Sequence, residues 1–385
     1  MKGHVRKRGK ESWAIVLDLG RDADGKRRQK WHSVKGTKRD AEREMARLVN
    51  SLNVGDYIEP SKIRVSEFLA KWLEDYAKAN VSPKTYERYE QIIDSSIVPK
   101  LGAHRLADLR PMHIQGFYSE AMRDGRRDGK GGLSAQTVLH FHRLLHKTLA
   151  QAVKWQLLAR NPADAVDPPK PEKKSMRALD EGETAELLRY VEGSLLYMPV
   201  LLAVTTGLRR GEILALRWQD IDMDRAQATI VRSLEQTKEG LRFKRPKTER
   251  SSRNVALPSF VVEALKRYRV EQATHRLKLG LVYEDQDLIC ARDNGAAIPP
   301  DTLSTNFAST IRRSTMSHVR FHDLRHTHAT QLLKHGVHPK VVSERLGHSK
   351  IGITLDTYSH VMPGMQEDAA LKMDAVLRKS MLDGG

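Results

Sequence analysis

The residues best suited to chemistry lie in one stretch, residues 321–358, near the C-terminal end of the chain. His322 and Arg325 are three positions apart, so on a helix, which the apolar spacing after them favours, both point to one face. An imidazole that donates or accepts a proton, beside a guanidinium that stays charged, suits a bound phosphate. His348 follows Gly347 at an expected helix start, where backbone N–H groups also attract an anion.

Tyr358 follows His348 by ten residues and supplies a hydroxyl that could attack a phosphate held by these cations. Its polar surroundings predict a loop or a short exposed helix. A single tyrosine in such a place is usually ordinary packing, so its spacing from His348 is what supports a functional role.

Composition bounds the class of protein before any other motif is considered. The 385 residues suffice for two or three domains. An excess of 66 Lys and Arg over 48 Asp and Glu gives a net charge of +18, which favours a nucleic acid or an anionic membrane as the partner. A solvated basic surface is the plain alternative.

The membrane alternative is weak. The most apolar run, residues 195–208, is broken by Pro199 and is shorter than the roughly 20 residues of a membrane span. The charged N-terminus lacks the apolar segment of a secretory signal. One cysteine, Cys290, excludes an internal disulfide framework and a cysteine-based zinc site. These features predict a cytoplasmic protein.

Residues 1–55 are predicted to form a small α+β module, a three-stranded sheet plus a helix. Residues 13–19 alternate in polarity as a strand does, Asp24-Gly25 is a hairpin turn signal, and residues 30–34 suit the return strand. Thr37 is a candidate cap for the helix. Fifteen Lys and Arg against seven Asp and Glu give this segment +8 of the net charge, which predicts a DNA-binding module. A solubilising cap on the next domain is the alternative.

Residues 63–165 are predicted to form an all-α bundle. Apolar residues in 65–76 keep the spacing of an amphipathic helix. Helix-start signals follow at Ser82, Pro111 and Ser134, which gives four helices in one compact domain.

The proline-dense stretch 161–177 predicts no helix, and residues 166–177 are assigned as a basic linker. Residues 178–385 are predicted to form a mainly-α domain with a small antiparallel sheet, which makes the chain multidomain. A final amphipathic helix is expected over residues 365–381. The strands are predicted at residues 228–234, 241–246 and 253–257.

Five motifs in residues 178–358 together resemble the catalytic domain of the tyrosine recombinase, or phage integrase, family. Each motif alone is a weak match, but all five in this order, ending in the tyrosine, are highly specific. The whole layout also resembles three-domain members, with an arm-type DNA-binding module, a core-binding domain and a catalytic domain. The motifs are Thr-Gly-Leu-Arg-x-Gly-Glu (206–212), Pro-Lys-Thr-x-x-Ser (246–251), His-Asp-Leu-Arg-His-Thr (322–327), Leu-Gly-His-Ser (346–349) and Thr-x-x-x-Tyr (354–358).

The resemblance implies how a scissile DNA phosphate would be held. Arg209 and Arg325 would grip its non-bridging oxygens, because a guanidinium bonds two oxygens at once and stays charged. His348 would hydrogen-bond the same phosphate. Glu212 lies one helical turn from Arg209 and is expected to orient it rather than react. A surface ion pair between these two is the alternative.

The resemblance also implies the covalent step. Tyr358 would attack and form a 3′-phosphotyrosyl bond, with His322 as the best-placed base. Lys247, on a hairpin turn and in competition with Lys244, would protonate the departing 5′ oxygen. No metal, ATP or other cofactor is implied. His326 and His328 are expected to be structural and to lie outside the site. This expectation rests on their position just after the motif arginine, Arg325.

The implied function is site-specific recombination that integrates and excises a mobile element, such as a viral genome. The implied partners are double-stranded DNA at attachment and arm-type sites, a homotetramer on that DNA, and an excisionase or DNA-bending accessory protein. The helix at 365–381 would dock onto a neighbouring subunit, and the protein would work at the nucleoid of a bacterial host cell.

Two other functions compete with recombination. One is a non-catalytic, architectural DNA-binding protein of the same fold, which would be expected to lack some of the catalytic positions. The other is a metal-dependent nuclease or hydrolase built from histidines, although carboxylates are few there and no His-Glu-x-x-His pair occurs. Its candidate ligands are His322, His326, His328 and His348.

Overall fold

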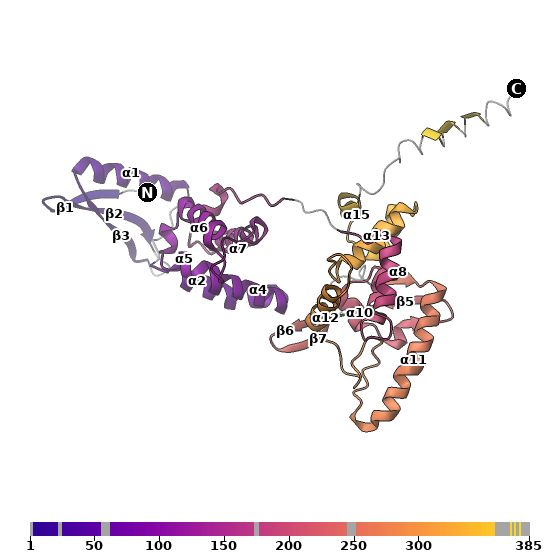
Figure 1. The fold of residues 1–385 in the computed structure, drawn as a ribbon. Coiled ribbons are helices and arrows are strands. Elements are labelled where there is room, and N and C mark those ends of the chain that lie inside the picture. The colour runs from indigo at the N-terminus through magenta and orange to yellow at the C-terminus, as the bar shows by residue number, and fades with distance from the viewer. Residues whose placement is uncertain are drawn as a thin grey trace. The chain divides into compact units, whose positions relative to one another are not determined.

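The chain forms two compact units in its computed structural model, Met1–Lys173 and Lys174–Gly385, and each is described by itself (Figure 1). The boundary between the units falls inside the stretch assigned as linker from the sequence. The structure describes residues 3–21, 25–54, 62–172, 177–244, 252–358, 370–371, 373–374 and 377–378.

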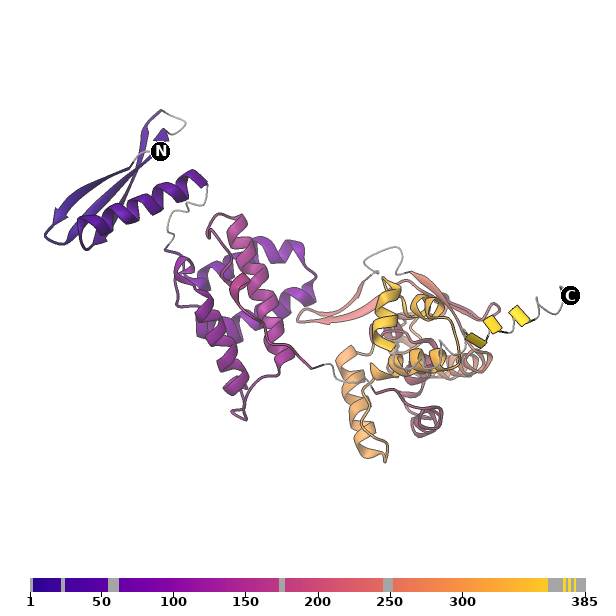
Figure 2. The ribbon, with the colours of Figure 1, turned by 90° about the horizontal axis from the view of Figure 1, so that it is seen from above.

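The first unit begins with the small sheet and helix that the sequence predicts. β1 (Gly3–Gly9), β2 (Ser12–Arg21) and β3 (Arg27–Lys35) pair antiparallel in that order, and α1 (Lys38–Val54) follows (Figure 2). The module has an apolar core of its own, because alternate residues of the central strand face the helix. Its buried members are Ile15, Leu17 and Leu48.

The rest of the first unit is a helical bundle around a second core. The helix caps fall where the sequence predicts them, with Pro83 in the first turn after Ser82 and with the Ser134 hydroxyl accepting from a backbone N–H. Two helices run on through a π-helical turn each. The helices are α2 (Val65–Trp72) and α3 (Lys78–Asn80) joined by Leu73–Ala77, α4 (Pro83–Ile92) and α5 (Val98–Leu101) joined by Ile93–Ile97, α6 (Pro111–Asp124) and α7 (Ala135–Lys154).

The proline-dense stretch contains one short helical turn, which the sequence prediction missed. A 3₁₀ turn spans Pro162–Ala165 because the Asn161 side chain caps it, accepting from the Ala163 N–H at 2.9 Å. Ala163 and Val166 are buried in the bundle core, so this part of the stretch belongs to the bundle.

The second unit is mainly helical and packs around α9, which is apolar on all sides because it lies in the centre of the core. α13 packs directly against α9. The helices are α8 (Glu181–Tyr190), α9 (Tyr197–Thr206), α10 (Arg210–Ala215), α11 (Ser259–Leu279), α12 (Pro300–Arg313), α13 (Asp323–Lys334), α14 (Pro339–Leu346) and α15 (Ile351–Tyr358).

The strands of the second unit form two sheets where one was predicted. The predicted strand at 228–234 is two strands, because the chain turns at Arg232, whose guanidinium donates to the Ala215 carbonyl at 2.8 Å. Its first half pairs within a three-stranded sheet and its second half within a separate hairpin. The sheet has the order β4 (Ile221–Asp222), β5 (Gln227–Ile230) and β8 (Arg253–Ala256); the hairpin is β6 (Ser233–Thr237) and β7 (Gly240–Lys244).

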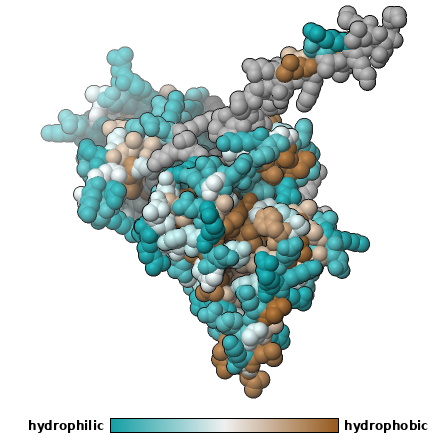
Figure 3. All heavy atoms as spheres, turned by 45° about the vertical axis from the view of Figure 1, so that its right-hand side comes forward, coloured by the Kyte–Doolittle hydropathy of each residue, from teal (hydrophilic) through white to brown (hydrophobic). Residues whose placement is uncertain are grey.

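Two surface features complete this unit. The end of α11 and the turn after it form the tip at the bottom of Figure 3, where brown atoms gather. Exposed apolar side chains of this segment include Leu277 and Leu281. Most of the helix expected over residues 365–381 lies outside the described residues; Leu371, Met373 and Leu377 are described and are exposed. No described helix is both long enough and apolar enough to cross a membrane.

Candidate active site

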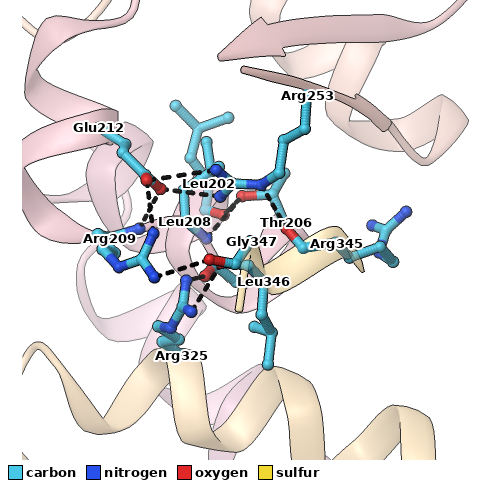
Figure 4. Close-up of polar contacts among 11 residues, drawn as sticks. Leu202, Thr206, Leu208, Arg209, Glu212, Arg253, Arg325, Arg345, Leu346 and Gly347 are labelled. Carbon is cyan, nitrogen blue, oxygen red and sulfur yellow. Dashed lines mark hydrogen bonds and ion pairs between the residues drawn. The ribbon is translucent and has the colours of Figure 1, made fainter. Parts of the chain in front are cut away.

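Arg325 belongs to the cluster shown in Figure 4 and lies on the helix predicted for it. It is 4% exposed, and its two terminal nitrogens donate to the carbonyls of Gly207 and Leu346, both at 2.7 Å. A guanidinium has five N–H donors, so others remain for a ligand. Burial and the charge of Arg209 lower the pKa of Arg325 to about 9, so the guanidinium stays charged at neutral pH and an anion would be favoured beside it.

Arg209 precedes α10 and is held beside Arg325 by two contacts. Its guanidinium donates to the Glu212 carboxylate at 2.9 Å and to the Gly347 carbonyl at 3.0 Å. The side chain keeps 44% of its surface exposed, which leaves it open to a ligand. The contact with Glu212 is the one that the sequence predicts.

Arg253 joins this cluster, and the sequence analysis missed it. Its guanidinium is 8% exposed and donates to the Glu212 carboxylate at 2.9 Å and to the Arg345 carbonyl at 2.8 Å. Burial raises the pKa of Glu212, but the hydrogen bonds and charges of Arg253 and Arg209 outweigh it, so the net pKa lies below its ordinary value. One carboxylate thus fixes two guanidiniums.

Two motif glycines make the close approach of these elements possible. Gly207 and Gly347 have φ angles of 67° and 66°, the left-handed region that glycine adopts without strain. A Cβ on Gly207 would lie 2.6 Å from the His328 ring, and one on Gly347 would lie 2.8 Å from the Arg253 guanidinium. Their carbonyls are therefore free to meet the two arginines.

His348 lies after a helix end, so the prediction of a helix start there is wrong. Gly347 caps α14 in the left-handed conformation, and the His348 N–H turns back to the Ser343 carbonyl at 3.0 Å. The imidazole Nδ1 lies 2.8 Å from the Thr354 hydroxyl. Burial and the charges of Arg325 and Arg209 lower the pKa of His348 to about 4, so the ring is neutral at neutral pH.

Tyr358 is the last residue of α15, so of the two predictions, a loop or a short exposed helix, the structure has a short and partly exposed helix. The Tyr358 side chain itself is buried, at 2% exposure, which the sequence did not predict. Its ring packs in an apolar cluster that includes Ala329 and Leu346. Burial raises the pKa of Tyr358 to about 12, and the charge of Arg325 acts in the opposite direction. The Tyr358 hydroxyl is therefore within electrostatic reach of Arg325.

The hydroxyl of Tyr358 lies 2.6 Å from Nδ1 of His326, so the expectation that His326 lies outside the site is wrong. His322 caps the same helix one turn earlier, and the two imidazoles meet edge to face at 5.2 Å. The i, i+4 spacing of His322 and His326 could have predicted the contact between these two rings. His328 has the structural place expected of it, buried with Nδ1 3.0 Å from the Val204 carbonyl.

Lys247 lies outside the described residues. Its competitor Lys244 is described and forms an ion pair with Glu235 at 2.7 Å. Among the described residues, no group of three or more His, Cys, Asp or Glu side chains could hold a metal ion. The described site therefore combines fixed guanidiniums, neutral imidazoles and one phenol, a set suited to binding an anion and moving a proton.

Comparisons with known proteins agree with this geometry. The phage integrase family model matches residues 177–364, and the phage integrase N-terminal SAM-like domain matches residues 64–122. A protein described as tyrosine recombinase XerC-like, from Caldanaerobacter subterraneus subsp. tengcongensis, is 29% identical over 96% of this chain and 97% of its own length. The ICEBs1 integrase of Bacillus subtilis is 27% identical over 77% of this chain and 78% of its own.

Solved structures share the fold. The Tn1549 transposon integrase in complex with a circular intermediate DNA aligns with a TM-score of 0.66 at 19% identity, over 82% of this chain and 99% of that one. A lambda integrase tetramer bound to a Holliday junction gives a TM-score of 0.56 at 19% identity, over 90% of this chain and 95% of that one. With both family models matched and a relative aligned along almost its whole length, this chain belongs to the phage integrase family of tyrosine recombinases.

Proposed function

We propose that this recombinase cuts and rejoins double-stranded DNA at specific sites through a covalent bond between Tyr358 and a 3′ phosphate. The observation that carries the proposal is the convergence of Arg209 and Arg325, both fixed by backbone carbonyls, with Arg325 within electrostatic reach of the Tyr358 hydroxyl. These three residues come from three separate motifs of the sequence, so their meeting is a property of the fold.

The two arginines bind the non-bridging oxygens of the scissile phosphate. Negative charge grows on these oxygens as the pentacoordinate transition state forms, and donors already in place stabilise it without reorganising. His348, neutral and beside the arginines, donates a further hydrogen bond, and His322 lies within reach of the same charges. This set supplies the positive charge that metal ions supply in many other phosphoryl-transfer enzymes.

Attack by the Tyr358 oxygen displaces the 5′ oxygen, which takes a proton from Lys247 as it leaves. An ammonium suits that task because it releases a proton far more readily than a guanidinium does. The phosphotyrosyl bond keeps the energy of the phosphodiester, so a 5′ hydroxyl of another strand restores the DNA backbone without ATP. No metal or other cofactor takes part.

The parts outside the site recognise DNA and build the assembly. The solved integrases of the same fold are bound to DNA, one of them as a tetramer on a Holliday junction, which supports a homotetramer of this chain on its own DNA. Residues 1–55 bind arm-type sites, residues 63–165 the core site, and residues 365–385 a neighbouring subunit. The task is integration and excision of a mobile element at the bacterial nucleoid, with an excisionase or DNA-bending protein as an accessory.

A nicked suicide substrate tests the covalent step. Its attachment sequence comes from short direct repeats in the DNA that flanks the coding region. The intact chain is expected to form a covalent protein–DNA adduct in the presence of a chelator, and Tyr358→Phe is expected to form none while still binding the DNA. Tyr190→Phe, at an exposed tyrosine, is the control and keeps the adduct.

Each rival function predicts a different result. A metal-dependent nuclease loses activity with the chelator. An architectural DNA-binding protein binds the substrate and forms no adduct with any variant. An adduct formed by Tyr358→Phe contradicts the proposal itself.

A further inference from the structure

We propose that His326 is a further catalytic residue of this site, the acceptor of the Tyr358 proton during strand cleavage. The inference rests on the proposed function, in which Tyr358 is the nucleophile. It assigns to His326 the task that the sequence motif alone would give to His322.

Geometry is the first reason. Nδ1 of His326 lies 2.6 Å from the Tyr358 oxygen, within the range over which a general base takes a proton directly. The phenol is 2% exposed and ends α15, while His326 lies within α13, so two packed helices fix the contact. His322 instead meets the His326 ring edge to face, and burial together with the charge of Arg325 lowers the pKa of His322.

The protonation states are the second reason. The titratable and charged groups that interact with His326 are His322, Asp323, Arg325, Arg320, His348 and the Tyr358 hydroxyl. Burial and the positive neighbours lower the pKa of His326 to about 4, despite Asp323, so a nitrogen lone pair is free at neutral pH. The hydrogen-bonded tautomer that suits this role carries its proton on Nε2 and accepts at Nδ1.

The proton therefore moves with the attack and not before it. The pKa of Tyr358 is raised to about 12, so the neutral phenol and neutral imidazole are the stable resting pair. As the phenol oxygen forms its bond to phosphorus, it loses basicity, and its proton passes to Nδ1 of His326. The bond between phosphorus and the 5′ oxygen breaks, and that oxygen keeps the electron pair and takes a proton from Lys247.

Religation reverses the same transfers. The imidazolium of His326 returns its proton to the phenol oxygen as an incoming 5′ hydroxyl displaces it, and that hydroxyl gives its proton to Lys247. Each residue ends in the state in which it began, and no oxidant, reductant or further reactant is needed.

Single-turnover cleavage of the suicide substrate tests the role, with His326→Asn and His322→Asn as a matched pair. Asparagine can still hydrogen-bond the phenol from about the position of Nδ1, but it cannot take the proton. His326→Asn is expected to cleave at least about 100-fold more slowly at neutral pH, with DNA affinity within about twofold of the wild type. A merely structural role would not alter the pH profile, so the profile is measured as well.

The expected profiles separate the two histidines. Between pH 6.5 and 8.5 the wild-type rate should change little, because His326 is already deprotonated. The rate of His326→Asn should rise about tenfold per pH unit, since the phenol must then lose its proton to hydroxide. His322→Asn should lose rate but keep the flat profile.

Several outcomes overturn the inference. A flat profile for His326→Asn, or a rising profile for His322→Asn in its place, removes His326 from the role, while the proposed function stands as long as Tyr358→Phe forms no adduct. If His326→Asn fails to fold, the wild-type chain with a fluorinated, more acidic tyrosine at position 358 replaces it. Transfer to His326 then predicts a solvent deuterium isotope effect on cleavage that shrinks on fluorination, and an unchanged effect contradicts it.

Discussion

The arginine half and the tyrosine half of the site are built in different ways. Arg209 and Arg325 are each tied to backbone carbonyls of remote motifs, and Glu212 braces Arg209 from behind. Among the described residues, Tyr358 makes one hydrogen bond, with His326, and its ring packs against apolar side chains. In the proposed mechanism, the positive charge that stabilises the transition state is therefore in place beforehand, whereas the nucleophile stays neutral until a phosphate arrives.

The largest effect is expected at the most rigid member of the arginine half. Arg325→Lys keeps the charge but loses the fork that bonds two carbonyls and a phosphate together. We expect single-turnover cleavage to fall by about 1000-fold with DNA binding retained. Arg320→Lys, on the same helix start but 70% exposed, is the control and should cleave within a fewfold of the wild type. Equal losses in both variants would show that the fixed carbonyl contacts do not matter.

Removing the brace should have a smaller effect on chemistry and a clear one on stability. Glu212→Gln keeps the shape but leaves Arg209 and Arg253 without their shared carboxylate. We expect the cleavage rate to fall by about 10- to 100-fold and the free energy of unfolding to fall by about 3 kcal/mol, as when a buried ion pair loses one partner.

Asp220→Asn is the matched control for Glu212→Gln. Asp220 is equally buried and pairs with Arg217 at the same i, i+3 spacing, but away from the site. It should lose stability and keep its cleavage rate. If thermal unfolding and suicide-substrate cleavage respond alike in the two variants, Glu212 acts only through stability.

Contacts between residues close together in the sequence could be predicted, and contacts between residues far apart in the sequence could not. Helical spacing placed His322 and Arg325 on one helix and Glu212 one turn from Arg209, because contacts within a helix depend only on sequence separation. The contacts of Arg253 with Glu212 and of His326 with Tyr358 span 41 and 32 residues, and only the packed fold creates them. Their residue types alone carried no signal of a meeting.

The error at His348 has a different cause. Glycine occurs both before helices and directly after them, and the anion-binding argument favoured the former. A left-handed Gly347 after the apolar end of α14 is the commoner arrangement, and Arg345 in the last turn of that helix agrees with it. The burial of Tyr358 was not predicted, because polar neighbours in the sequence say little about which face of α15 packs against α13.

A pH experiment sharpens the comparison further, because His328 supports the arginine half without touching a ligand. Burial lowers the pKa of His328 to about 4 from an ordinary 6.5, so the fold favours the neutral ring. The contribution of the neutral His328 ring to the free energy of unfolding is therefore present above pH 6.5 and is lost as the pH falls toward 4. The loss is about 2 kcal/mol between pH 7 and 5.

The corresponding variant is His328→Asn, which keeps a donor for the Val204 carbonyl. Thermal unfolding midpoints of the full chain are expected to fall less steeply from pH 7 to pH 5 in this variant than in the wild type. His318→Asn, at an exposed histidine, should leave the steepness unchanged. A variant as pH-sensitive as the wild type would mean that burial of His328 does not govern the acid response.

The smallest effect is expected in the other compact unit, on the N-terminal sheet. Arg6 is exposed with its guanidinium 5.8 Å from the Trp31 ring, a basic and aromatic pair suited to a DNA backbone. Arg6→Gln should lower the slope of log affinity against log salt by about 1 for arm-type DNA, and leave suicide-substrate cleavage unchanged. Arg47→Gln, on α1 and paired with Glu44, is the control and should leave the slope as it is. A change in the cleavage rate without a change in the salt slope would mean that Arg6 acts on the active site and not on DNA binding. The charges that bind DNA and the charges that act in cleavage would then not be separate.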